Sequence, residues 1–544
     1  MPASRDPASH TAISGDLADS LLTLLKTLPT QPCHHVRHTL AMGIRLLTAL
    51  RGSSEDISLA ASTHDVGDIG WQQPLQRRLL QAWQSWQEGS ALWLQNLDLP
   101  DADRQRLAWL NRQLSAALAP ANSPANPLFL HEFKRSKGRS LKSGLTRLAS
   151  DLALGQPLAP LIDQDDYLVG RDLATTEGQV VLRDALFELI QYKPRQTQVY
   201  QRPLLIIPPP LNRFYLLDLN PQQSLIRHAL DQGLQVFLIS WRNPQPEHCE
   251  WGFAQYVSAS ERALAATSSI TASPQTSLLG VCAGGLLGLL LQGLLQARGQ
   301  SARLCAASYL VTPIDPRLDT PLVRLCGPAT QQRLRNRVWQ QGYLSAGQLS
   351  ASFAWLRPEQ FVWPQALARY ALNQPQAKRD ILYWSQDSTR LPARLVDDLI
   401  DLFQRDPLSR AGHLCLMGQP MDLPSCSIPT WHLGARRDHI VPWTNCFPGH
   451  RLGGDAHFVQ SHSGHIQSLI NPPEHPGAIL RSGPATGDAA SWLAASVEHK
   501  GSWWPHWSNW LRGHSGALHP GPTNLGGIGH PTLGPAPGRY IHDC

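Results

Sequence analysis

The sequence predicts an α/β protein in which a helical domain precedes a mostly parallel sheet. From residue 204 onwards, short apolar runs alternate with amphipathic stretches, as the strands and helices of a doubly wound sheet require. Before that point, leucine and tryptophan recur every three or four residues, which is typical of helices. We therefore expect a mostly helical N-terminal domain over residues 1–155 and an α/β domain over residues 156–544.

The composition indicates a large folded core and excludes two classes of protein. Apolar residues make up 42% of the chain and charged residues 16%, which excludes wholesale disorder. The 47 Lys and Arg residues exceed the 41 Asp and Glu residues and give a net charge of +6, but they form no basic block typical of nucleic-acid binding. We expect no nucleic-acid partner.

Cysteine usage and the first residues bear on cofactors and location. The nine cysteines include no C-x-x-C pair, so we expect neither a disulfide scaffold nor a metal site of the zinc type. Residues 1–16 are polar and lack the apolar core of a signal peptide. We expect a cytoplasmic protein that needs no bound cofactor.

The N-terminal domain contains three predicted helices and a connector. Apolar spacing predicts helices over residues 21–50, 79–97 and 102–118, and the Pro- and Asn-containing stretch 119–127 is typical of a connector. The next stretch, 128–155, carries Lys and Arg residues close together. For it we favour a solvated surface over a specific anion site.

Six apolar runs predict the strands of the sheet. They are residues 204–207, 236–241, 276–281, 304–311, 430–434 and 457–461. One stretch, 278–295, is nearly all apolar and has the length of a membrane span. Because it contains five glycines and its first part alternates as a strand does, we favour a buried strand that leads into a central helix, and expect no transmembrane segment.

Two regions of the α/β domain are additions to the alternating pattern. Residues 313–407 form an insertion rich in Trp, Arg and Leu, placed at the carboxyl end of a strand, where open α/β sheets bind ligands. We therefore expect a helical cap or lid. The tail, residues 495–544, contains four tryptophans in its first part, for which we favour core packing over contact with an apolar surface: Trp503, Trp504, Trp507 and Trp510.

The strongest local signal is the sequence Gly-Val-Cys-Ala-Gly at residues 280–284. It follows a predicted strand and opens a predicted helix, which is the spacing G-x-S-x-G of a nucleophile elbow with cysteine in the serine position. The turn that presents a nucleophile is strained and leaves no room for a Cβ at the two glycine positions. By itself this short motif is compatible with a buried cysteine in a glycine-rich packing turn.

The order of later residues strengthens the catalytic interpretation. In the α/β-hydrolase fold the acid follows the nucleophile in sequence and the histidine comes last, each on a loop after a later strand. Asp438 follows the predicted strand 430–434, and His465 follows the predicted strand 457–461. We therefore predict an α/β-hydrolase fold with Cys282, Asp438 and His465 as its catalytic residues.

The residue types predict a mechanism. His465 would take the proton of Cys282, and the thiolate would attack an acyl carbonyl. The oxyanion needs two backbone N–H donors, one from Ala283 and one from the loop after the strand 204–207. Because the prolines at 208–210 have no N–H, we assign the second donor to Leu211.

Cysteine in place of serine favours acyl transfer over hydrolysis. An acyl-cysteine is a thioester, so it keeps the activation of a thioester donor such as an acyl-CoA and can pass the acyl group to an alcohol. A cysteine-dependent thioesterase or esterase, with the same triad and water as acceptor, remains the alternative.

Taken together, these residues and their surroundings resemble the polyhydroxyalkanoate synthases, which polymerise 3-hydroxyacyl-CoA into storage polyester. The likeness covers most of the chain. Its longest motifs are VGRDLATTEG (169–178), ELIQYKP (188–194), NRFY (212–215), SWRNP (240–244), DSTRLP (387–392), DHIVPW (438–443) and GHI (464–466).

The resemblance implies a single-subunit enzyme, closest to the medium-chain-length class II, with a hydrolase-type catalytic domain, a cap, a helical N-terminal domain and dimerisation. It implies that Cys282 carries the growing chain, that His465 is the base, and that Asp438 helps activate the incoming hydroxyl. The implied partners are 3-hydroxyacyl-CoA, the polyester and the surface of its granules.

The chain departs from the family pattern at two places. Pro210 stands where the family usually has Trp or Gln, and residues 522–537 are richer in Gly and Pro than expected. Neither departure touches the triad. A granule-associated homologue without activity is a further alternative, against which the presence of all three triad residues counts.

Overall fold

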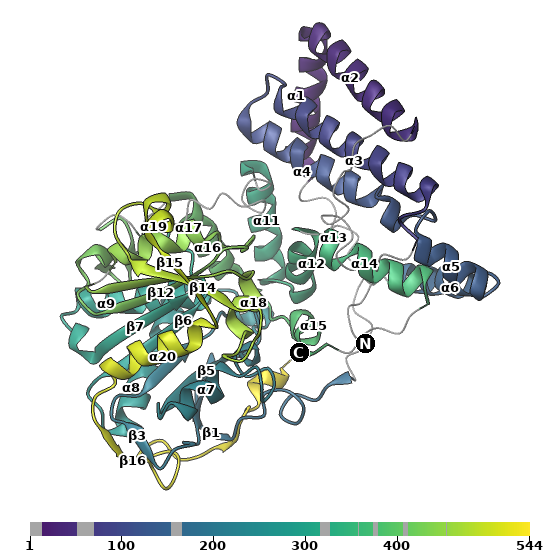
Figure 1. Ribbon diagram of the computed structural model, residues 1–544. Helices are drawn as coiled ribbons and strands as arrows, with labels where there is room; N and C mark the ends of the chain where they lie inside the picture. The colour runs from purple at the N-terminus through teal and green to yellow at the C-terminus, as the bar shows by residue number, and fades with distance from the viewer. Residues whose placement is uncertain are drawn as a thin grey trace. The chain divides into compact units, whose positions relative to one another are not determined.

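The computed structural model describes residues 14–51, 70–153, 166–315, 327–356, 358–373, 379–405, 408, 412–452 and 454–543 (Figure 1). The chain divides into two compact units. The first comprises residues 1–163, 321–334 and 348–378, and the second comprises residues 164–320, 335–347 and 379–544. The insertion at 313–407 is therefore shared between the two units.

The first unit is built from helices. Those that precede the sheet in sequence are α1 (Ser14–Thr27), α2 (Pro32–Arg51), α3 (Pro74–Gln95), α4 (Asp101–Ala117), α5 (Pro127–Arg135) and α6 (Arg139–Ala153). Leu94, Leu97, Leu99 and Leu107 form a small buried cluster where α3 leads into α4. The predicted helix over 102–118 coincides with α4, whereas the predicted helix over 21–50 is interrupted after Thr27, where Pro29 and Pro32 follow.

Part of the insertion belongs to this helical unit. The short π-helical segment η9 (Leu367–Ala371) packs against α6. There the carboxylate of Asp151 pairs with Arg369 at 2.9 Å and accepts the Tyr370 hydroxyl at 2.7 Å. This contact holds together two segments that are more than two hundred residues apart in the sequence.

The second unit contains an eleven-stranded sheet with the order β15-β14-β13-β12-β7-β6-β4-β5-β2-β1-β17. Six neighbouring strands run parallel: β4 (Leu204–Ile207), β5 (Val236–Trp241), β6 (Thr276–Val281), β7 (Leu304–Leu310), β12 (Thr430–Ala435) and β13 (Ala456–Ser461). These are the six predicted strands, with ends that differ by at most one residue. The parallel sheet and its strand order confirm the predicted α/β-hydrolase fold class.

The sheet is extended by antiparallel strands that the sequence patterns did not predict. They are β1 (Gly178–Arg183), β2 (Phe187–Tyr192), β14 (Ile479–Pro484), β15 (Val497–Lys500) and β17 (Gly534–Pro535). β15 is fully exposed and β17 has only two residues, so neither carries an apolar run that would indicate a strand.

Helices cover both faces of the sheet (Figure 1). On one face, α7 (Leu225–Asp231) and α20 (Trp503–His514) share a core with Leu204 and Ile206 of β4. Alternation along the strand turns Ile207 to the other face, where α9 (Ala283–Ala297) lies over it and α8 (Phe253–Thr271) packs beside α9. Residues 278–295 are thus a buried strand and a buried helix.

The tryptophans at the start of the tail are part of this core. Trp503, Trp504 and Trp507 are at most 2% exposed, and the Trp507 indole donates to the Ser308 hydroxyl of β7 at 3.0 Å. The packing interpretation is confirmed for these three residues. Among the described residues, no helix is both long and apolar enough to cross a membrane.

Candidate active site

Cys282 lies at the sharp turn between β6 and α9. Its backbone has φ 50° and ψ −120°, a left-handed conformation that costs free energy for a residue with a side chain. A Cβ added to Gly280 would lie 2.5 Å from the Cα of Gly285, and one added to Gly284 would lie 2.5 Å from Pro208. Both glycines are therefore required by backbone contacts, which is the steric basis of the elbow spacing.

Asp438 is oriented by its own loop. The loop follows β12, and the Oδ1 atom of Asp438 accepts the N–H groups of Ile440 at 2.8 Å and Val441 at 2.9 Å. The second carboxylate oxygen, Oδ2, remains for a partner from another element. Because two backbone donors fix the first oxygen, the direction of the second is also fixed.

His465 is that partner. It is the first residue of α18 (His465–Ile470), which follows β13, and β13 pairs in parallel with β12 so that Ser461 lies beside Ala435. The Nδ1 atom of His465 lies 2.6 Å from Asp438 Oδ2. An ionised carboxylate only accepts hydrogen bonds, so Nδ1 carries the proton and Nε2 is the ring atom left for another group.

The electrostatics of His465 link it to both neighbours. Burial favours the neutral ring, but the nearby Asp438 carboxylate, which hydrogen-bonds the imidazole, and the nearby Cys282 sulfur outweigh that effect and raise the pKa of His465 above its usual value. His465 is 5% exposed. The three predicted catalytic side chains are thus brought together from three loops, and the arrangement can move a proton from the thiol to the ring.

The loop that follows β4, residues 208–212 (the β4 loop), lies against the elbow at Gly284. Its carbonyl groups are held from outside the loop. The Trp241 indole donates to Pro208 O at 2.8 Å, the Thr389 hydroxyl to Pro210 O at 2.6 Å, and the Thr389 N–H to Leu211 O at 3.3 Å. The structure therefore places Leu211 in a fixed loop that borders the nucleophile turn.

Ala283, the other predicted oxyanion donor, is the first residue of α9. The first N–H groups of a helix have no acceptor within it, so they are available to a ligand. The oxyanion roles of Ala283 and Leu211 stay predictions.

The residues that hold the β4 loop were not singled out from their chemistry. Trp241 and Thr389 lie in SWRNP and DSTRLP, and the β4 loop leads into NRFY, three motifs that carried only the resemblance. Motifs of one family that lie far apart in the sequence are expected to meet at a shared place in the fold, and this was the available signal. Here they converge on one loop.

Within the described ranges, no group of three or more His, Cys, Asp and Glu side chains is arranged to hold a metal ion.

Comparison with known proteins gives similarities over nearly the whole chain. Residues 66–229 match the family model described as Poly-beta-hydroxybutyrate polymerase (PhaC) N-terminus. Poly(3-hydroxyalkanoate) polymerase 2 of Ectopseudomonas oleovorans is 40% identical over 97% of this chain and 94% of its own length. Poly(3-hydroxyalkanoate) polymerase 1 of the same organism is 37% identical over 97% of this chain and 95% of its own. A hydrolase from Pseudomonas aeruginosa PA01, known as a crystal structure, is 14% identical, with 54% of this chain and 92% of that chain covered and a TM-score of 0.31.

Proposed function

The chain belongs to the poly(3-hydroxyalkanoate) polymerase family, and on that premise we propose that it polymerises (R)-3-hydroxyacyl-CoA into polyester with release of CoA. The enzyme is an acyltransferase. The observation that carries the finer proposal is the 2.6 Å contact of His465 with Asp438 beside a cysteine that is held in an elbow and is near enough to shift the pKa of His465.

The first half of the reaction loads the enzyme. His465 Nε2 takes the proton from the Cys282 thiol as the sulfur attacks the thioester carbonyl of the substrate. The negative charge on the carbonyl oxygen is stabilised by the N–H groups of Ala283 and Leu211. The bond to the CoA sulfur then breaks, His465 returns the proton to it, and the acyl group remains on Cys282 as a thioester.

The second half extends the chain. The 3-hydroxyl group of an incoming 3-hydroxyacyl-CoA loses its proton to His465 while its oxygen attacks the carbonyl of the acyl-Cys282 thioester. The bond between that carbonyl and the sulfur breaks, and His465 returns the proton to the departing Cys282 thiolate. An ester bond has formed and the cysteine is free for another cycle. Asp438 supports this step because its negative charge stabilises the imidazolium that forms.

Cysteine suits this sequence of steps energetically. The acyl-Cys282 thioester lies close in free energy to the CoA thioester that supplied it, so loading is nearly balanced and ester formation is downhill. This reaction needs no cofactor beyond the CoA thioester of the substrate. We further propose that the enzyme works at the surface of polyester granules in the cytoplasm and as a homodimer.

The test uses purified protein and a 3-hydroxyacyl-CoA. We expect release of CoA together with insoluble polyester, and neither from Cys282→Ala. Release of CoA with soluble 3-hydroxy acids as the only product would replace polymerisation by thioester hydrolysis. A series of acyl chain lengths in the same assay measures the substrate range, for which the class II resemblance predicts a medium-chain preference.

A further inference from the structure

Arg213 connects the β4 loop to a distant part of the chain. It comes two residues after Leu211, and its side chain is 5% exposed. Its guanidinium pairs with the Asp387 carboxylate at 3.1 Å, and its backbone carbonyl accepts the Trp384 indole at 2.8 Å. Burial of a guanidinium group is costly unless its donors are hydrogen-bonded, so the remaining partners of Arg213 matter.

Those partners are backbone carbonyls of the segment 538–543, which we call the tail segment. Arg213 Nη1 donates to Tyr540 O at 3.0 Å, and Nη2 donates to Asp543 O. The two residues are more than three hundred positions away in sequence. Because the acceptors are carbonyls, the contact depends on where this backbone lies and not on which side chain stands at 543.

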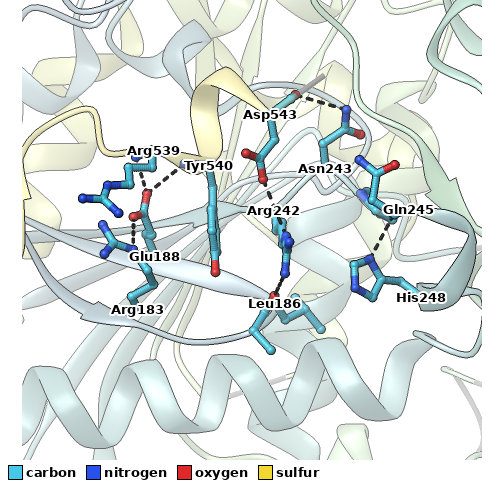
Figure 2. Close-up of polar contacts among 12 residues, drawn as sticks. Arg183, Leu186, Glu188, Arg242, Asn243, Gln245, His248, Arg539, Tyr540 and Asp543 are labelled. Atoms are coloured by element: carbon cyan, nitrogen blue, oxygen red, sulfur yellow. Dashed lines mark hydrogen bonds and ion pairs between the residues drawn. The ribbon is translucent and has the colours of Figure 1, made fainter.

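The tail segment reaches the β4 loop by a second route, and Figure 2 shows its first contact, between Asp543 and Asn243. Asp543 O also accepts the side-chain amide of Asn243 at 3.2 Å, and Asn243 Oδ1 in turn accepts the Arg390 N–H at 2.9 Å. Arg390 follows Thr389, whose hydroxyl and N–H hold the carbonyls of the β4 loop. The Asp543 carbonyl is thus linked directly to Arg213, which follows the β4 loop, and through Asn243 and Arg390 to Thr389, which holds the loop.

A buried carboxylate fixes the tail segment in place (Figure 2). Glu188 of β2 is 0% exposed, and its Oε2 accepts the N–H groups of Arg539 at 2.7 Å and Tyr540 at 3.0 Å. Its other oxygen pairs with Arg183 at 2.7 Å. The Tyr540 hydroxyl donates to Asp184 O at 2.8 Å, and Ile541 is 3% exposed. The tail segment is therefore docked by charge, hydrogen bonds and apolar burial together.

From these contacts we propose that residues 538–543 act as a latch that positions the β4 loop for catalysis, with Arg213 as the positioning residue. The proposal rests on the proposed function, since it assumes that this loop supplies an oxyanion donor. Without the latch, Arg213 loses two acceptors and draws the loop out of place. A displacement of about 1 Å costs up to about a hundredfold in rate when the displaced group is part of the site.

The experiment compares two reactions of the same thiol. Transfer of the acyl group from a 3-hydroxyacyl-CoA to Cys282 needs the oxyanion donors, whereas alkylation of Cys282 by iodoacetamide forms no oxyanion. In a chain that ends at Pro537 we expect single-turnover CoA release to fall about ten- to a hundredfold. Alkylation, followed by peptide mass spectrometry at Cys282, should stay within about twofold of the unchanged enzyme.

Arg539→Ala is the matched control and should leave both rates unchanged, because only its backbone N–H contacts Glu188 and its side chain is exposed.

A second variant covers the case in which the shortened chain does not fold. Arg213→Lys keeps a positive charge but cannot reach the carboxylate and both carbonyls at once, so it should show the same selective loss of CoA release. An unchanged rate of CoA release in either variant overturns the proposal, and so does an equal loss of both reactions in Arg213→Lys. The proposed function has its own test, because CoA release that persists in Cys282→Ala contradicts that function whatever the latch variants do.

Discussion

The proposed active site has two walls that are built in different ways. The first wall is formed by the Cys282, His465 and Asp438 side chains at the ends of β6, β13 and β12, and we propose that each acts through its own functional group. The second wall is the β4 loop, whose proposed contribution is a backbone N–H group and whose carbonyls are held by Trp241 and Thr389. The two walls meet at Gly284, where there is no room for a side chain.

The difference shows what each kind of wall requires from the sequence. A wall of side chains needs a particular residue type at a few positions, so a single substitution removes its chemistry. A wall of backbone donors needs only that the backbone lies in the right place. Many contacts together determine that place, so each single substitution should lower the activity by a smaller amount.

The largest effect is expected from Cys282→Ser, which breaks the side-chain wall. A serine fits the elbow, but its hydroxyl is much less acidic than a thiol, and an acyl-serine loses the activation of a thioester. We predict that CoA release in a single turnover falls by about 10³-fold or more, with an unchanged thermal unfolding midpoint. A variant that keeps more than a tenth of the original rate would show that the thiol is not the nucleophile.

Asp438→Asn weakens the same wall without removing the nucleophile. The amide cannot stabilise the imidazolium of His465, and this matters most when the ring must activate an alcohol, which is a weaker acid than a thiol. We predict a loss of about 10²-fold or more in chain growth and a smaller loss in the first acylation. The two steps are separated by measuring CoA release in the first turnover and polymer mass over many turnovers. Equal losses in both would contradict this division of roles.

Thr389→Val tests the backbone wall. The substitution keeps the shape of the buried side chain but leaves the Pro210 carbonyl without its donor, which we expect to cost about 1–3 kcal/mol of stability and about tenfold in acyl transfer. Thr389→Ser, which keeps the hydroxyl, is the matched control and should retain most of the rate. If both variants behave alike in transfer assays, the hydrogen bond to the β4 loop does not position it.

The smallest effect on activity is expected at His432, which lies on the strand that leads to Asp438 and stacks on the Tyr309 ring at 5.5 Å. Burial, assisted by the charge of His450, lowers the pKa of His432 to about 3. The unfolded chain therefore binds a proton below about pH 6.5 that the folded chain does not, and stability is lost as the pH falls, by about 2 kcal/mol at pH 5.

His465 has the opposite dependence. Because the pKa of His465 is raised, its contribution to stability is present below about pH 6.5 and is lost as the pH rises through the folded-state value.

The contribution of His432 is measured with a variant. Urea unfolding of His432→Leu between pH 5 and 7 should show a flatter loss of stability toward acid pH than the unchanged protein. An equally steep acid side in both proteins would assign the loss to other groups.

The sequence allowed prediction of the side-chain wall and of the strands beneath it. The six parallel strands are continuous apolar runs because both of their faces are buried, and a run of that kind is visible without any knowledge of its partners. The order of Cys282, Asp438 and His465 after these strands was equally visible, because each residue type has a distinct chemistry.

The backbone wall and its supports were predictable only in part. The prolines at 208–210 limited the donors in the β4 loop to Leu211 and Asn212, but nothing in their pattern shows that carbonyls of residues 540 and 543 meet Arg213. Backbone acceptors are present at every residue, so their use leaves no mark on the sequence. The exposed edge strand β15 was missed for a related reason, since it buries no apolar run.

The most direct test of the account is the identity of the residue that carries the acyl group. The unchanged enzyme is mixed with a 3-hydroxyacyl-CoA, quenched in acid within the first turnovers, and digested for mass spectrometry. We predict an added acyl mass on the peptide that contains Cys282, removed by neutral hydroxylamine as a thioester is, and strongly reduced in His465→Gln. Acyl mass on another residue, or polymer formed while Cys282 remains unmodified throughout, would contradict the account.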